Sequence, residues 1–481
     1  MVPDQVRRVV ATTTATARAG ALTSGRRPTW WERRLATATP AAHGGRLASH
    51  LRLHVRVGGV VSGRRLSGMA RRITAETPPD RDRGVDALRA FAILGVVLGH
   101  WLVTALVADS GALRVTSPLR HMPWLAPVSW IFQTMALFFL VGGWTAAGSL
   151  ASARARGDSY GRWLRRRMAR LCGPLAPLAV VWGAAAVVML ASGVDVATVR
   201  ALAKLVWSPL WFLLVFAVLT AATPVAVRLS PVWPLAVVAG ADLVRFGLDG
   251  PAWVGWVNVA AGWLVPYCLG ASWAGGRVPG RRAGWALLLG GAAVTAVLVL
   301  RAGYPASMVG VPGARVSNQS PPTLAAVTFG LAQSGAALLL LQPLRRVLSR
   351  PVAWAVVALV NLSAMTVYLW HQTAMIAVTG LGLLAGRPLA GLHTVPGSVA
   401  WVGARLAWLP VFGCVLVAYV AAFRSAEDGV AGHAGGRQDG EPSPALRQAA
   451  PGEGARAPGP EPGAEQGSGG QRPEIRSASR A

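Results

Sequence analysis

Arg89 and His100 are the residues whose types and spacing first suggest chemistry. They lie in one apolar segment, 11 positions apart, which in an α-helix is three turns plus about 20°, or roughly 16 Å along one face. A neutral imidazole can act as a general base near pH 7, and a guanidinium binds anions. The spacing therefore predicts a helix face with an anion contact at one end and a base deeper in the segment. The alternative, a snorkelling arginine and a histidine that packs between helices, is equally compatible with the spacing.

An arginine-rich segment occupies residues 160–174 and has the sequence YGRWLRRRMARLCGP. The simpler explanation is an anchor at lipid head groups, and the cluster alone favours it. The sharper hypothesis is a docking site for a polyanionic donor, because guanidinium groups bind phosphates in bidentate fashion. The candidate donor-binding side chains are Arg165, Arg167 and Arg170.

His371 is the other histidine inside an apolar segment, in the sequence TVYLWHQTAM. If its helix begins near residue 364, His371 lies about 10 Å along it, and His100 lies about 18 Å along its own helix. The two side chains could therefore line one cavity. Tyr368 and Asp242 are further candidates for lining it.

Acidic side chains are scarce: residues 86–423 contain six, all Asp, and no Glu. This argues against a two-carboxylate mechanism and against a proton relay of acidic groups. Asp242 is the one that lies well inside an apolar run, and an ion pair with Arg245 is its favoured explanation. Arg405 lies close enough to the end of the last run to snorkel. The three cysteines are isolated, so neither a metal site nor a disulfide scaffold is expected.

The composition excludes a soluble globular enzyme. Hydrophobic residues make up 53% of the chain and charged residues 14%, against roughly 25% charged in a typical soluble domain, and the mean hydropathy is +0.45. The net charge of +28 does not indicate nucleic-acid binding. The core arginines form short clusters between long apolar runs, which is typical of contact with anionic lipid in a bilayer.

Ten apolar runs, each near the roughly 20 residues that cross a bilayer, predict an all-α integral membrane protein with about ten transmembrane helices. Loops on one side carry twice as many basic residues as loops on the other. The positive-inside rule therefore predicts that both termini are cytoplasmic. We expect the protein to be in the plasma membrane. The fifth and seventh runs are the shortest. The ten predicted spans are 88–108, 125–150, 173–192, 205–224, 231–247, 253–274, 283–300, 322–342, 364–385 and 399–422.

Three regions are expected along the chain. Residues 1–85 are a basic arm, predicted to be disordered, with Met69 as a candidate true start. Residues 86–423 form the membrane domain. Residues 424–481 are rich in Gly and Pro and are predicted to be a disordered cytoplasmic tail.

Several motifs resemble the membrane acyltransferase 3 family. The first span of that family carries an Arg and, eleven positions later, a His, matched here by Arg89 and His100 in RGVDALRAFAILGVVLGHW. Its Arg-x-x-Arg loop is matched by Arg167 and Arg170 in WLRRRMARL, and VYLWHQTA is similar to a segment of actinobacterial members. The resemblance covers about residues 83–422.

The resemblance implies an enzyme that transfers an acyl group, usually acetyl, from acyl-CoA to a hydroxyl or amine of a glycan, a lipid or a small natural product. Acyl-CoA, normally acetyl-CoA, would be a donor substrate, and no bound cofactor is expected. Arg89 would contact the donor, while His100 would deprotonate the hydroxylated acceptor or carry the acyl group itself. Two alternatives remain open. One is a multi-pass transporter or flippase for an amphipathic substrate, and the other is a non-catalytic membrane scaffold.

Overall fold

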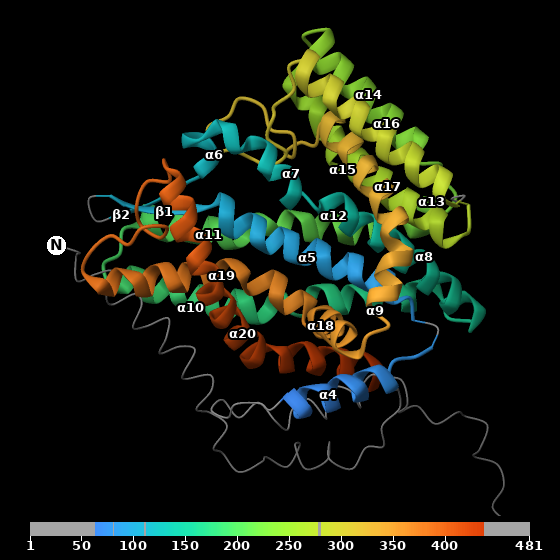
Figure 1. Cartoon of the computed structure of the whole chain (residues 1–481), viewed down its shortest axis with the longest axis horizontal. Helices are drawn as coiled ribbons and strands as arrows, with labels where there is room; N and C mark the ends of the chain where they lie inside the picture. Colours follow the sequence, from blue (N-terminus) through green and yellow to red (C-terminus); the bar gives the residue numbers. More distant parts are fainter. Residues whose placement is uncertain (1–62, 80, 110–111, 278–279, 437–481) are drawn as a thin grey trace, which may run out of the picture. The chain divides into compact units, whose positions relative to one another are not determined.

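A computed structural model of the protein describes residues 63–79, 81–109, 112–277 and 280–436. The elements discussed below belong to one compact unit that ends at Gly435. Most of this part is helical, as predicted, and it also contains an antiparallel hairpin of β1 (Ala105–Asp109) and β2 (Ala112–Thr116). Figure 1 shows the hairpin directly after the first long helix of the bundle.

The longer helices are α4 (Gly63–Ala75), α5 (Arg83–Val103), α8 (Met135–Ala155), α9 (Tyr160–Cys172), α10 (Leu175–Ala191), α11 (Val196–Trp207), α12 (Trp211–Ala221), α14 (Val232–Asp242), α15 (Val257–Ala274), α16 (Gly280–Arg301), α17 (Leu324–Val347), α18 (Pro351–Leu362), α19 (Ala364–Gly382) and α20 (Val399–Gly436). The short turns of helix are α6 (Pro118–His121), η2 (Pro123–Val128), α7 (Ser129–Phe132), η3 (Ser208–Leu210), α13 (Thr223–Ala226), η4 (Leu243–Gly247), η5 (Ala252–Trp256) and η6 (Leu383–Ala385).

Within the described residues, nine helical stretches are long and apolar enough to cross a membrane. They correspond to nine of the ten predicted spans, including the short seventh one, which is α16. The nine stretches are Arg83–Val103, Pro123–Ala155, Tyr160–Ala191, Val196–Ala221, Ala252–Ala274, Gly280–Arg301, Leu324–Val347, Ala364–Ala385 and Val399–Phe423.

The remaining predicted span, 231–247, folds as α14 followed by the π-helical turn η4. Two hydrogen bonds, one to the segment that precedes α14 and one at its last residue, place this helix beside α15. Near the last residues of α15, Arg277 donates to the main-chain oxygen of Val227 at 2.5 Å. Near the first residues of α15, Asn258 donates to the Asp242 carboxylate at 2.9 Å. The two helices are therefore antiparallel, and α14 follows α15 along most of its length.

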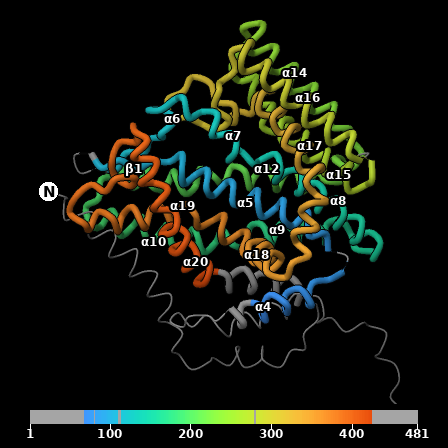
Figure 2. The backbone as a smooth tube through the Cα atoms, viewed as in Figure 1, coloured from blue at the N-terminus to red at the C-terminus, as the bar shows by residue number. Residues whose placement is uncertain are grey.

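The bundle has two ends that matter for the site. We call one end the α9 end, and it contains the start of α5 together with α9 and α18. Asn361 of α18 lies there because it donates a hydrogen bond to the main-chain oxygen of Asp86 at 2.8 Å. The end of α5 and the hairpin form the β1 end, which also holds the connection from α19 to α20, because the Ala108 N–H donates to the His393 carbonyl at 3.0 Å. Figure 2 shows β1 and α9 on opposite sides of α5.

Glycines allow α8 and α15 to pack closely at the centre. A methyl group added at Gly143 would overlap the main-chain oxygen of Tyr267, and one added at Gly270 would overlap that of Leu140. Without a hydrophobic force between helices in lipid, small residues of this kind let backbones approach. Gly143 and Gly270 thus bring α8, which lines both cavities described below, against α15.

Burial separates central from peripheral helices. At least 61% of the apolar window is buried in the stretches that contain α5, α8, α15 and α19, whereas only 17% is buried in α16 and 11% in α20. The poorly buried helices expose apolar side chains that suit lipid, and α5 and α19 lie in the interior. These two carry the histidines of interest.

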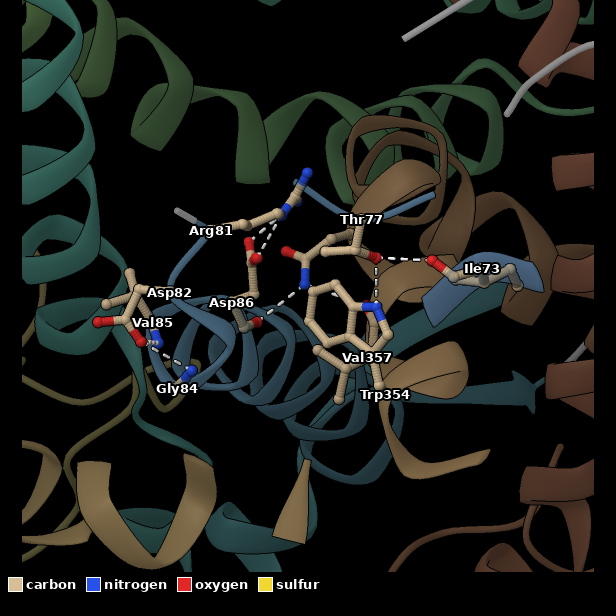
Figure 3. A network of polar contacts seen from close by, with 10 residues as sticks. Ile73, Thr77, Arg81, Asp82, Gly84, Val85, Asp86, Trp354 and Val357 are labelled. Atoms are coloured by element: carbon tan, nitrogen blue, oxygen red, sulfur yellow. Dashed lines mark hydrogen bonds and ion pairs between the residues drawn. The ribbon is translucent and has the colours of Figure 1, made fainter. Parts of the chain in front are cut away.

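Residues 63–79, which lie within the arm predicted over residues 1–85, consist of α4 and the turn that follows it. Ala70 and Ile73 of α4 pack against Trp354 of α18, and the indole N–H of Trp354 donates to Thr77 Oγ1 at 2.7 Å. Figure 3 shows this network next to the start of α5. The segment thereby supports the helix that carries Arg89. The boundary of the arm below residue 63 lies outside the described residues.

Candidate functional site

A cavity of about 220 Å³ lies at the α9 end, and we call it the arginine cavity. It brings Arg89 of α5 together with Arg167 and Arg170 of α9, as the donor-binding hypothesis requires. Arg165 is exposed and is not among the lining residues. The complete lining is Arg89, Phe138, Val141, Gly142, Thr145, Arg167, Met168, Arg170, Leu171, Phe216, Thr220 and Met365.

Arg167 is held by α8 while part of its guanidinium remains available. Its Nη2 donates to the main-chain oxygen of Thr145 at 2.9 Å and to Ser149 Oγ at 2.7 Å, and its guanidinium lies 5.4 Å from the centre of the Trp163 ring. Trp163 also donates to Ser149 Oγ, at 3.0 Å. These contacts fix one edge of the fork, so its other N–H groups can bind an anion in a defined orientation.

Arg89 has neither a hydrogen bond nor an ion pair within the described residues, and its side chain is partly buried. The Asp86 carboxylate stabilises this cation only from a distance, because it pairs with Arg81 at 2.6 Å. An anionic ligand would therefore lower the cost of keeping Arg89 partly buried. The three arginines therefore give this cavity a lining whose chemistry suits an anion such as a phosphate group.

A second cavity, of about 360 Å³, lies between α5, α19 and the loops of the β1 end, and we call it the histidine cavity. His100 and Tyr368 line it, and no Asp, Glu, Lys or Arg does. Its lining is Val96, Gly99, His100, Val103, Thr104, Val115, Thr116, Phe132, Gln133, Met135, Leu205, Ser208, Pro209, Trp211, Phe212, Val309, Gly310, Pro312, Ser317, Gln319, Ser320, Tyr368 and Gln372.

Hydrogen bonds define the tautomers of the two histidines. His100 Nδ1 lies 2.9 Å from the main-chain oxygen of Val96, and His371 Nδ1 lies 2.6 Å from that of Tyr368. A carbonyl oxygen accepts only, so each Nδ1 carries the proton and each neutral ring keeps an unprotonated Nε2. Both rings can then accept a proton at Nε2.

His100 and His371 meet across α5 and α19, with ring centroids 5.0 Å apart. His371 does not line the histidine cavity directly but lies behind His100. It is 1% exposed, and its Nε2 has no hydrogen-bond partner among the described residues. His100 therefore has direct access to a ligand in the cavity, while His371 supports it from behind.

Arg405 of α20 contributes to the site in a way that the sequence analysis missed. It is 1% exposed, so the prediction that it snorkels is wrong. Its guanidinium donates to the main-chain oxygens of Trp101 and Thr104, each at 2.7 Å, and of Gly391 at 2.9 Å. Trp101 in turn donates to the His371 carbonyl at 2.9 Å. An arginine almost two turns inside an apolar helix was the available signal, because intramembrane cations usually pair with internal acceptors.

Asp242 lies away from both cavities, and the predicted ion pair with Arg245 is wrong. Instead its carboxylate accepts hydrogen bonds from Asn258 at 2.9 Å, from the Tyr304 hydroxyl at 3.0 Å and from the Leu324 N–H at 2.6 Å. Burial and then the Asp242 charge raise the pKa of Tyr304, so that hydroxyl remains a donor. The carboxylate thus fastens both ends of the loop that lines the histidine cavity through Val309–Ser320.

Within the described residues, no group of three or more His, Cys, Asp or Glu side chains is placed to hold a metal ion.

A helical membrane bundle with an anion site and a neutral imidazole suits a membrane transferase. A family model described as an acyltransferase domain matches residues 82–423, which defines the class as a membrane acyltransferase. The chain belongs to the acyltransferase 3 family. No curated protein and no solved structure gives a significant match.

Proposed function

We propose that this protein transfers an acetyl group from acetyl-CoA to a hydroxyl group of a neutral acceptor. The observation that carries the proposal is the pair of cavities along α5. Three arginines line one cavity, and a histidine with a free Nε2 lines the other. Coenzyme A supplies the phosphates that the arginines suit.

His100 is the general base in this proposal. Its Nε2 takes the proton of the acceptor hydroxyl while the hydroxyl oxygen attacks the thioester carbonyl carbon. The new C–O bond forms as the C–S bond breaks, and the imidazolium returns the proton to the departing thiolate. Ester and free thiol are the products, and no further co-reactant is needed.

The lining of the histidine cavity supports a neutral, hydroxylated acceptor. Gln133, Gln319 and Gln372 can each donate and accept hydrogen bonds, and Trp211 offers an aromatic face. A charged acceptor would find no counter-ion among the lining residues. A sugar or a hydroxylated natural product fits this chemistry.

The proposed orientation places the α9 end and both termini in the cytoplasm, where acetyl-CoA is made. The contacts of α14 with α15 support counting α14 and η4 as a tenth membrane crossing beside the nine longer helical stretches. An even number of crossings puts both termini on the same side of the membrane. Epitope insertions at residue 158 should be protected in the cytoplasm, and insertions at residue 312 should be accessible from outside. The reverse pattern would exclude this orientation.

The catalytic proposal is tested with protein in lipid nanodiscs, radiolabelled acetyl-CoA and a panel of neutral sugars, amines and glycerolipids. Wild type should label a hydroxylated compound and release free thiol in equal amount. His100→Asn keeps a donor for the Val96 oxygen but removes the basic nitrogen, and it should lose labelling. His121→Ala, at the exposed last residue of α6 and outside both cavity linings, is the matched control. Equal labelling by wild type and His100→Asn would exclude His100 as the base. Movement of a candidate acceptor across vesicle membranes without any labelling would favour the transporter hypothesis.

A further inference from the structure

The arginine and histidine cavities are separated by three phenylalanines. Phe138 and Phe216 line the arginine cavity, and Phe212 lines the histidine cavity. The ring centroids of Phe138 and Phe212 are 4.7 Å apart, and those of Phe138 and Phe216 are 5.2 Å apart. The separation between the cavities at this point is therefore one pair of touching rings. We call the three residues the aromatic partition.

The aromatic partition is closed on its flanks. The Phe212 ring also contacts Phe139 at 5.1 Å and Tyr368 at 5.7 Å between centroids. On the other flank, the Phe216 ring fills the notch that Gly142 leaves in α8, where an added methyl would overlap the ring. At this point of the bundle, an acyl group can move from the arginines toward His100 only if the rings turn.

We propose that the aromatic partition is the barrier that the donor thioester must cross to reach His100, and that it sets the length of the acyl group transferred. This inference rests on the proposed acyl transfer. The donor phosphates bind at the arginines, and the base lies beyond the rings, so the thioester must pass between them. Rotation of the rings lets a narrow chain pass. Once the rings close around a bound thioester, carbons beyond the acetyl methyl compete with Phe212 for space.

The chain-length test compares acetyl-, butyryl-, hexanoyl- and octanoyl-CoA with the acceptor identified for wild type. Wild type should prefer acetyl. Phe212→Leu and Phe212→Ala should each raise the ratio of hexanoyl to acetyl transfer, the alanine variant by tenfold or more. Phe329→Leu is the matched control, because it removes a ring that contacts Trp130 and lines neither cavity. Ratios within twofold of wild type in folded Phe212 variants would overturn the length assignment.

The barrier is also tested without any transfer reaction. Ser208, which lines the histidine cavity, is replaced by cysteine after Cys172 and Cys414 are changed to serine. A membrane-impermeant maleimide should label Ser208→Cys in oriented vesicles from the β1 end alone. With Phe138→Ala and Phe212→Ala added, labelling should occur from both ends. Labelling from both ends with the three rings intact would overturn the partition, whatever the transfer assays show. If no protein, wild type included, transfers an acyl group but labelling still occurs from the β1 end alone, the proposed function is wrong and the barrier stands.

Discussion

The arginine cavity and the histidine cavity lie along the same helix but differ in charge. Arg89, Arg167 and Arg170 give the first a net positive lining, and the second has polar groups that are all neutral apart from a titratable imidazole. A cation beside His100 would disfavour its protonation, and a carboxylate would favour the imidazolium. One helix, α5, can therefore carry both a cationic cavity lining and a neutral base, because about three helical turns and a layer of phenylalanine rings lie between Arg89 and His100.

The cavities also differ in how the chain builds them. The arginine cavity depends mainly on the α8–α9 hairpin, in which Arg167 binds Ser149 and Thr145 about twenty positions earlier. The histidine cavity combines α5, α11, α19 and a loop fastened by Asp242. The first cavity should therefore tolerate distant changes better than the second.

The largest expected effect is at the base. His100→Asn should lower kcat by about 10²–10⁴, the usual contribution of a general base. The Kd for acetyl-CoA should stay near the wild-type value, because our proposal places the donor phosphates in the other cavity. Turnover assays and donor titration in nanodiscs measure the two quantities. A matching rise in donor Kd would show that the two cavities are not separate in function.

Arg405 should have the next largest effect, and it acts on the histidine cavity alone. Arg405→Leu leaves three buried main-chain oxygens without donors, at about 1–3 kcal/mol each. We expect a thermal midpoint several degrees lower, and a tenfold or greater fall in kcat with an unchanged donor KM. The control is Arg301→Leu at an exposed helix end. If the two variants are equally stable, Arg405 does not hold α5 as described.

Arg167→Lys should affect the arginine cavity alone. Lysine keeps the charge but loses the planar fork that bonds α8 and, in our proposal, a donor phosphate. The donor KM should therefore rise about tenfold, which corresponds to about 1.4 kcal/mol. Saturation curves for acetyl-CoA measure the change. Arg165→Lys, which is exposed and outside the cavity, should match wild type. Equal KM values for the two variants would contradict the anion site.

The smallest effect concerns the pH dependence of stability at the α9 end. Partial burial opposes ionisation of Asp82, but hydrogen bonds from Arg345 and from main-chain N–H groups outweigh it and lower the pKa of the carboxyl group below 3.8. The ion pair therefore contributes stability above about pH 4, and the contribution is lost as the pH falls through the lowered pKa. Asp82→Asn keeps the helix cap and should cost about 1 kcal/mol or less at pH 7. Thermal unfolding between pH 7 and pH 3 should show the midpoints of wild type and Asp82→Asn converging as the pH falls. A difference in midpoint that persists at pH 3 would exclude the Asp82–Arg345 pair as its source.

The spacing of Arg89 and His100 was sufficient to predict one helix face, since both belong to α5 and helical geometry is local. The sequence also placed Arg167 and Arg170 near the entrance to that face through a family motif. It did not predict the role of Arg405 or the partners of Asp242, because each binds main-chain or side-chain groups from distant segments. Hydropathy shows how far such a residue lies inside an apolar segment, but it does not show which neighbouring group forms its hydrogen bonds.

The sequence by itself determined which segments are apolar helices, how long they are and which residues share a face, because these properties depend on runs of side chains and on a fixed helical period. The tertiary structure alone decided that His100 meets His371, that Arg405 fastens the end of α5 and that three phenylalanines divide the two cavities. Helices in lipid gain little from hydrophobic burial against each other. Their neighbours are chosen by glycine contacts and by hydrogen bonds between segments far apart in the chain, neither of which leaves a periodic pattern in the sequence.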